Sequence, residues 1–100
     1  MARFDVYSLK GKAPLVVDVQ ADILGGLSSR IVIPLLPSAE LGAEAIPRLK
    51  PAVKLNGVEY RLITTDMSAL AASQLGDHLG SLDDQRLVII DAIDFAFQGF

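Results

Sequence analysis

The feature that most constrains the fold is a pair of alternating segments, residues 51–56 and 58–66, which meet at Asn56 and Gly57. Within each segment apolar and polar residues alternate, so the apolar side chains fall on one face of a half-buried strand. Asn-Gly is a favoured pair for the two-residue type I′ turn, in which both central residues need a positive φ angle. We therefore expect a β-hairpin in the second half of the chain.

Three earlier segments also have the pattern of strands. Residues 3–7 and 15–20 alternate, and residues 30–35 are rich in β-branched side chains. Pro34 lacks the N–H that a sheet ladder uses, so we expect the third of these strands to lie at an edge or to end there. Stretches that contain glycine, proline or serine predict a turn over 8–14 and loops over 21–29 and 76–80. Residues 37–46 fit either a short helical turn or an irregular crossover, and residues 67–75 fit either helix or strand.

The last twenty residues predict a helix over residues 81–97. Ser81 fits an N-cap, acidic residues follow it in the first turn, and Gly99 fits the stop. One stripe of the helix is apolar and consists of Ile89, Ile90, Ile93 and Phe97, with Val88 and Phe95 on its flank. This apolar arc is wider than one docking face requires, which suggests an interface between two subunits.

These elements predict a mostly β fold. About five strands joined by short turns favour antiparallel pairing, and hence a small barrel or curled sheet with a C-terminal helix against it. A length of 100 residues fits a single domain that spans residues 1–100.

Composition excludes several classes of function. The net charge of −3 gives no diffuse basic field for nucleic acid, and we expect no sequence-specific nucleic-acid binding. The absence of cysteine excludes disulfides and thiolate metal sites. No apolar run is long enough to span a membrane, and no signal peptide is visible, so we expect a cytoplasmic protein. Because 51% of the residues are hydrophobic, we expect one face to be buried in a homodimer.

The polar residues offer little catalytic chemistry. Asp18, Asp22 and Asp66 could meet as an acid–base cluster, although carboxylates at strand ends more often bind backbone donors in turns. His78 is the only histidine and has no partner at a known catalytic spacing. We therefore expect no catalytic residue, no metal site and no cofactor, and hence no enzyme.

One alternative is that the protein binds RNA. Three arginines, Arg30, Arg48 and Arg61, could form an RNA-binding patch with Tyr60.

Several segments together resemble the CcdB family, the toxins of the ccd toxin–antitoxin module, over almost the whole chain. They are Val17 to Gln20, Asp22 with Ile23, Arg30, Ile33 to Leu35, Thr64 to Met67, Leu75 with Gly76, and Ala92 to Phe100. The resemblance implies an SH3-like antiparallel barrel with a C-terminal helix, of the CcdB, MazF and Kid type, and a homodimer. It also implies that the gyrase A protein of DNA gyrase is the target, which the toxin poisons, and that a CcdA-like antitoxin neutralises it through a disordered segment that folds on binding.

The resemblance also implies the site residues. The gyrase-binding positions are Gln98, Gly99 and Phe100, and Gln98 stands where the family has tryptophan, which offers more stacking area. The antitoxin-binding positions are Ser8, Lys10, Lys12, Ile23, Leu24, Asp94 and Phe97. Two alternatives stay open: a ribonuclease toxin of the MazF and Kid type, dependent on Arg30 or Asp66, and a non-toxic CcdB homologue that only binds antitoxin.

Overall fold

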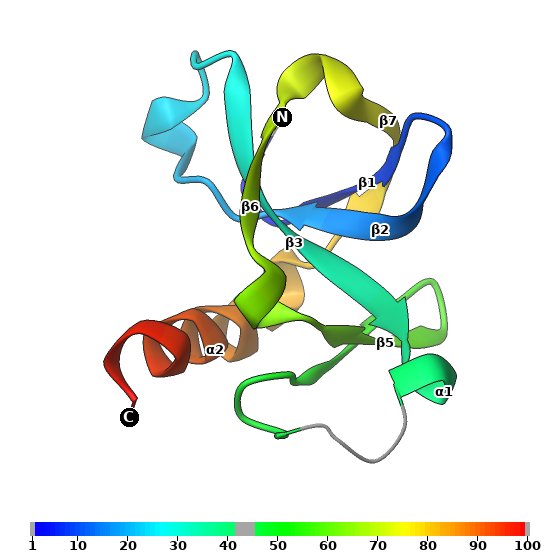
Figure 1. The fold of residues 1–100 in the computed structure, drawn as a ribbon, viewed down its shortest axis with the longest axis vertical. Helices are drawn as coiled ribbons and strands as arrows, with labels where there is room; N and C mark the ends of the chain where they lie inside the picture. Colours follow the sequence, from blue (N-terminus) through cyan, green and yellow to red (C-terminus); the bar gives the residue numbers. More distant parts are fainter. Residues whose placement is uncertain (1, 42–45, 100) are drawn as a thin grey trace.

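The computed structural model describes residues 2–41 and 46–99, which form a curled antiparallel sheet with a helix against it (Figure 1). The strands are β1 (Asp5–Leu9), β2 (Lys12–Asp18), β3 (Ser29–Pro37), β4 (Ala52–Leu55), β5 (Val58–Leu62), β6 (Ser68–Ala71) and β7 (Leu75–Ser81). The helices are α1 (Ser38–Leu41) and α2 (Arg86–Gln98). Short 3-10 turns are η1 (Asp22–Leu24), η3 (Thr64–Asp66), η4 (Ala72–Gln74) and η5 (Asp83–Gln85).

Strand β3 organises the sheet. The strand order is β4-β5-β3-β2-β1-β7, and β6 also pairs with β3. On one side β3 pairs with β2, whereas on the other its residues 29–32 pair with β6 and its residues 35–37 pair with β5. Figure 1 shows β3 crossing the molecule between these two groups of strands.

Pro34 lies inside β3, so the expectation that this strand is an edge or ends at Pro34 is wrong. Residues of β3 pair with strands on both sides, and the strand continues to Pro37. The carbonyl oxygen of Pro34 accepts a hydrogen bond from the backbone N–H of Ile63, so its nitrogen faces the same side of the strand. That side is where β3 changes its partner from β6 to β5, and the missing N–H therefore removes no ladder bond to β2.

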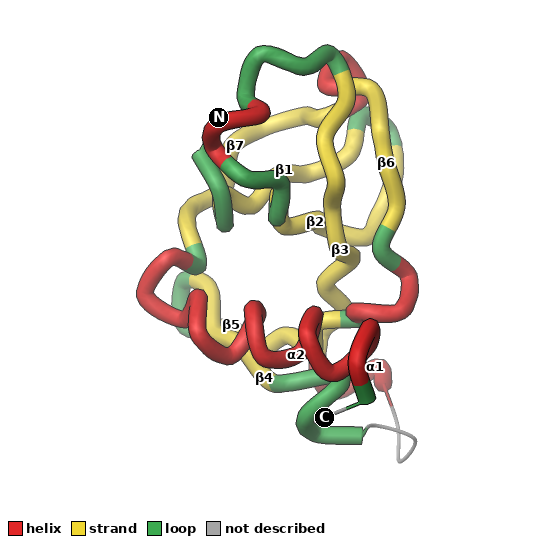
Figure 2. The backbone as a smooth tube through the Cα atoms, turned by 90° about the vertical axis from the view of Figure 1, so that its left-hand side faces the viewer, coloured by secondary structure: helices red, strands yellow, loops and turns green. Residues whose placement is uncertain are grey.

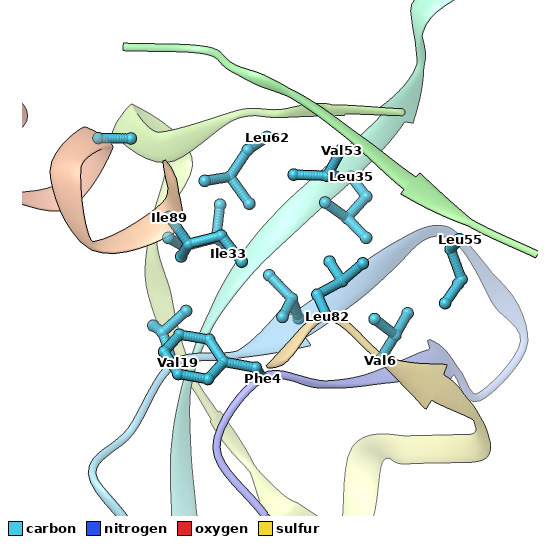
Figure 3. Packing of buried hydrophobic residues seen from close by; sticks show 12 residues of the cluster. Phe4, Val6, Val19, Ile33, Leu35, Val53, Leu55, Leu62, Leu82 and Ile89 are labelled. Atoms are coloured by element: carbon cyan, nitrogen blue, oxygen red, sulfur yellow. The ribbon is translucent and has the colours of Figure 1, made fainter. Parts of the chain in front are cut away.

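The main core fills the inside of the curled sheet (Figure 3). Alternate residues of the strands point inward, and Ile89 and Ala92 of α2 close the core from outside the sheet. Its buried members are Phe4, Val6, Val17, Val19, Ile33, Leu35, Val53, Leu55, Leu62, Leu82, Ile89 and Ala92. Figure 2 shows α2 at the same end of the molecule as β4 and β5, whereas β1 and β7 lie toward the other end.

A second, smaller cluster lies on the opposite face of β1, β2 and β3. Tyr7, Val16 and Val32 each stand next to a main-core residue along their strands, and Leu75 of β7 completes the cluster. These three strands are consequently buried on both faces, and this limits the polar chemistry that their middle sections can present to solvent.

The predicted fold class and hairpin are confirmed. Asn56 and Gly57 have φ angles of 52° and 81°, and Leu55 pairs directly with Val58 across the turn. The short helical turn expected within residues 37–46 is present as α1, and residues 42–45 lie outside the described part of the chain.

The loop expected over residues 76–80 is wrong, because these residues belong to β7. The glycines that suggested a loop are places of close approach. A Cβ atom on Gly76 would lie 2.5 Å from the Ser8 hydroxyl, and one on Gly80 would lie 2.8 Å from Leu55. The undecided segment 67–75 resolves into β6 and η4.

The C-terminal helix begins later than expected. Ser81 ends β7, where it pairs with Asp5, and its hydroxyl accepts a hydrogen bond from the N–H of Asp83. The N-cap of η5 is Leu82 and that of α2 is Gln85, so the expectation that Ser81 is the N-cap of the helix is wrong, and α2 follows only from Arg86.

Candidate functional site

The C-terminal end of α2 presents an aromatic side chain to solvent. Gly99 adopts the left-handed conformation, with φ 76°, and its N–H donates to the carbonyl of Phe95 at 2.8 Å. This is the expected helix stop, and it needs glycine because other residues are strained there. Phe97 is 76% exposed and Gln98 is also exposed, whereas Phe100 lies outside the described residues.

A shallow pocket lies beside Phe97. Its walls come from α2 and from η3 with the residue after it, and they comprise Thr64, Thr65, Met67, Ala96 and Phe97. The hydroxyl of Thr64 donates to the carbonyl of Leu49 at 2.6 Å, which fixes η3 against the preceding loop. The Thr64 to Met67 segment therefore lies next to the exposed end of the helix.

An ion pair joins residues 46–50 to the outer face of α2. The Arg48 guanidinium donates from Nε and Nη2 to the Asp91 carboxylate at 3.0 and 3.1 Å, and it also lies over the Phe95 ring. The hydrogen bond to Asp91 raises the pKa of Arg48. Because both charges are about half exposed, this pair positions the loop more than it stabilises the fold.

Four of the proposed antitoxin-binding residues are exposed, two on η1 and two on α2. Ile23 and Leu24 project from η1, and Asp94 and Phe97 from α2. Figure 1 shows η1 and the C-terminal end of α2 both on the left side of the molecule, η1 toward the upper end and α2 toward the lower end.

The other three antitoxin-binding candidates lie around the turn between β1 and β2, which Figure 1 places on the opposite side. The Ser8 hydroxyl accepts a hydrogen bond from the N–H of Asp77 at 2.9 Å. Lys10 is exposed, and its N–H donates to the carbonyl of Gln74. The side chain of Lys12 lies outside the described part of the structure. The fold thus separates the seven candidates into two groups.

The three aspartates do not form an acid–base cluster. Asp18 is fully buried and paired with Arg30, and one of its oxygens accepts the N–H of Gln20. Asp22 accepts the N–H of Arg3 at 2.7 Å, and Asp66 is exposed in η3. The expectation that such carboxylates bind backbone donors is confirmed for Asp18 and Asp22.

The three arginines of the suggested RNA-binding patch have separate partners. Arg30 is buried against Asp18, Arg48 binds Asp91, and Arg61 donates to the carbonyl of Lys50 at 3.0 Å.

One polar group was missed from the sequence. The Nε2 atom of His78 lies 3.4 Å from the carboxylate of Asp5, and the His78 ring contacts the edge of the Tyr7 ring. Burial and then the negative charges of Asp5 and Asp18 raise the pKa of the Tyr7 hydroxyl. These residues meet because β1 pairs with β7, a long-range contact that no local sequence pattern specifies.

Within residues 2–41 and 46–99, no three histidine or acidic side chains gather as metal ligands do. In the same ranges, no helix is long and apolar enough to cross a membrane.

A family model described as "CcdB protein" matches residues 3–99, which is nearly the whole chain. The chain belongs to the CcdB family. Solved structures share the fold of this CcdB family member. An endoribonuclease from Mycobacterial species matches with a TM-score of 0.76 and 18% identity, over 97% of this chain and 90% of that one.

Two further structures match similarly. An endoribonuclease in complex with its cognate antitoxin, from Mycobacterial species, has a TM-score of 0.77 and 17% identity. The match covers 97% of this chain and 94% of that one. The Mycobacterium tuberculosis toxin MazF-mt6 has a TM-score of 0.72 and 20% identity, and the match covers 95% of this chain and 96% of that one.

These structures correct the expectation that the protein is not an enzyme. That expectation came from the lack of a recognisable catalytic cluster, yet the same fold is found in proteins named as endoribonucleases. A scarcity of catalytic motifs in the sequence is therefore no argument against catalysis on this fold.

Proposed function

We propose that the protein is the toxin of a toxin–antitoxin module and that it binds and poisons the gyrase A protein of DNA gyrase in the cytoplasm. In this proposal, residues 1–100 form one domain and two copies form a homodimer. Membership in the CcdB family supports the toxin role, and so does the likeness to an endoribonuclease solved with its cognate antitoxin.

The observation that carries the gyrase assignment is the exposed end of α2. An aromatic side chain that is 76% exposed is costly in water and is typical of a contact surface. Gln98 is exposed directly after Phe97, and Gly99 ends the helix one residue later. We assign gyrase binding to the last residues, Gln98, Gly99 and Phe100.

The antitoxin would bind the two groups of residues described above. One group is Ile23, Leu24, Asp94 and Phe97, and the other is Ser8, Lys10 and Lys12. A disordered segment suits this arrangement, because an extended chain can reach separated surfaces that a compact domain would not span. The Phe97 surface then serves both partners, which makes the antitoxin and gyrase competitors.

The proposal is tested with purified gyrase and supercoiled plasmid. We expect the protein to inhibit supercoiling and to accumulate cleaved DNA, and a variant truncated after Phe97 to do neither. If the full chain at high concentration leaves both reactions unchanged, gyrase is not the target.

A second candidate function is that of a ribonuclease toxin, favoured by the names of the structures that share the fold. Incubation with total RNA would then give defined fragments, and replacing Arg30 or the exposed Asp66 would abolish them. Intact RNA at high protein concentration would contradict this candidate.

If induced expression without antitoxin allows normal growth, both toxin functions fail, and a homologue that only binds antitoxin remains.

A further inference from the structure

A buried guanidinium with one unused edge lies beneath η1. Arg30 is fully buried, and Asp18 Oδ2 lies 2.9 Å from its Nε and 2.6 Å from its Nη2. Neither Nη1 nor Nη2 makes a hydrogen bond among residues 2–41 and 46–99, although Nη2 lies within ion-pair distance of Asp18. Buried guanidinium N–H groups nearly always have partners, so the unused edge points to a ligand.

The cover over this edge is thin. A Cβ atom on Gly25 would lie 3.8 Å from Nη1, so Gly25 covers this edge with its backbone alone, and a ligand reaches the buried Nη1 atom only when the η1 turn moves outward. The turn in front of Gly25 buries none of its side chains, and Ile23 is 93% exposed. Buried Gln20 holds this turn in place, since its amide donates to the carbonyl of Leu24 at 2.9 Å.

We propose that the Nη1 edge of Arg30 binds a carboxylate carried by an acidic, aliphatic segment of the antitoxin. This inference rests on the proposed toxin–antitoxin role and deepens it. The planar fork of arginine offers two edges to carboxylates, and Asp18 uses only the one formed by Nε and Nη2. The second edge faces Gly25.

The surroundings favour a peptide over RNA. Ile23 and Leu24 of η1 and Leu27 after it are exposed aliphatic side chains that can pack against aliphatic neighbours of the carboxylate. RNA binding on this surface would need further cations or stacking aromatic groups. The nearby Arg3 guanidinium is already engaged, since it donates to the carbonyl of Val19 and lies over the Phe4 ring.

The test compares two synthetic peptides that differ in one residue. Each has a central glutamate or glutamine flanked by leucines, and binding to the full chain is followed through the Arg30 Nε–Hε NMR signal. We expect the glutamate peptide to shift this signal and to bind about tenfold more tightly than the glutamine peptide.

Two glycine variants supply the matched comparison. Gly25→Val places a side chain against Nη1, whereas Gly26→Val is its control, because a Cβ atom at Gly26 meets nothing within 4 Å. We expect Gly25→Val to remove the preference for glutamate and Gly26→Val to keep it. Thermal unfolding shows whether both variants stay folded, and the wild-type comparison stands without them.

Equal binding of the two peptides to the wild-type protein would overturn the inference, whatever the gyrase assay shows. So would a single-stranded RNA oligonucleotide that shifts the Arg30 signal when the glutamate peptide does not. If the protein prefers the glutamate peptide but is not toxic, the carboxylate site stands and the proposed toxin function fails.

Discussion

Two arginine–aspartate pairs in this molecule have the same chemistry and different surroundings. Arg30 and Asp18 have no solvent exposure, whereas Arg48 and Asp91 are about half exposed. Removing one partner of a buried pair leaves an uncompensated charge in the interior, but removing one partner of an exposed pair leaves a charge that water can solvate. The two pairs should therefore differ greatly in their effect on stability.

The substitution Asp18→Asn should lower the free energy of unfolding by about 3–5 kcal/mol, because the buried Arg30 loses its counter-charge. The exposed control, Asp91→Asn, should cost less than about 1 kcal/mol. Urea unfolding at neutral pH measures both values. Similar losses for the two variants would show that burial does not govern the Asp18–Arg30 pair.

The raised pKa of Tyr7 predicts that the protein loses stability in alkaline solution. Its pKa in the folded protein is raised, first by burial and then by the charges of Asp5 and Asp18, above the value of about 10 in the unfolded chain. The folded state therefore keeps the Tyr7 proton where the unfolded state has released it. This contribution is fully present below about pH 10 and is lost as pH rises through the folded pKa.

In the Tyr7→Phe variant, this part of the fall in the free energy of unfolding at alkaline pH should vanish. Free energies of unfolding measured between about pH 8 and pH 11 check the prediction, with Tyr60→Phe as the control, because Tyr60 is less buried. Parallel pH profiles for Tyr7→Phe and the wild-type protein would contradict it.

Among the elements, the edge strand β4 has the outer backbone groups of its residue Lys54 bound by one side chain, that of Gln85. The amide of Gln85 accepts the N–H of Lys54 and donates to the carbonyl of Lys54, both at 2.8 Å. It thus occupies backbone groups that an added strand would use, at one end of the sheet order.

Replacing Gln85 by alanine should expose this edge. We expect a loss of roughly 1 kcal/mol in stability and faster aggregation, seen by urea unfolding and by light scattering at increasing concentration. The control change Gln74→Ala, at an exposed glutamine of η4, should alter neither. Unchanged scattering of Gln85→Ala would mean that the amide is not what protects the edge.

The elements also show how far local pattern predicts this fold. The alternation around Asn56 and Gly57 predicted the hairpin, because turn chemistry and strand period are both local properties. Strand β7 escaped prediction because Gly76 and Gly80 serve close packing against Ser8 and Leu55, which are distant in sequence.

The functional sites could likewise be predicted only where the signal is local in the sequence. The exposure of the helix end could be suspected from its apolar sequence, and Gly99 as a stop was a local signal. The unused edge of Arg30 and the contact between Asp5 and His78 depend on strand pairing and burial, and no spacing in the sequence indicates either.

For the whole molecule, the proposed contacts lie on two sides of one curled sheet (Figure 1). The turn between β1 and β2 lies on one side, and η1 with the end of α2 lies on the other. In the proposed function Phe97 serves both gyrase and antitoxin, so competition between the two partners would neutralise the toxin without a change in its fold.

The central claim is that the exposed end of α2 binds gyrase, and α2 provides its own control. Phe97 and Leu87 are exposed to nearly the same extent, 76% and 75%, but only Phe97 lies at the C-terminal end. The most direct measurement is the dissociation constant for the gyrase A protein, by titration calorimetry, of the Phe97→Ala and Leu87→Ala variants. We predict about thirtyfold weaker binding for Phe97→Ala, as for a contact of about 2 kcal/mol, and no change for Leu87→Ala. Equal affinities of the two variants would contradict the claim.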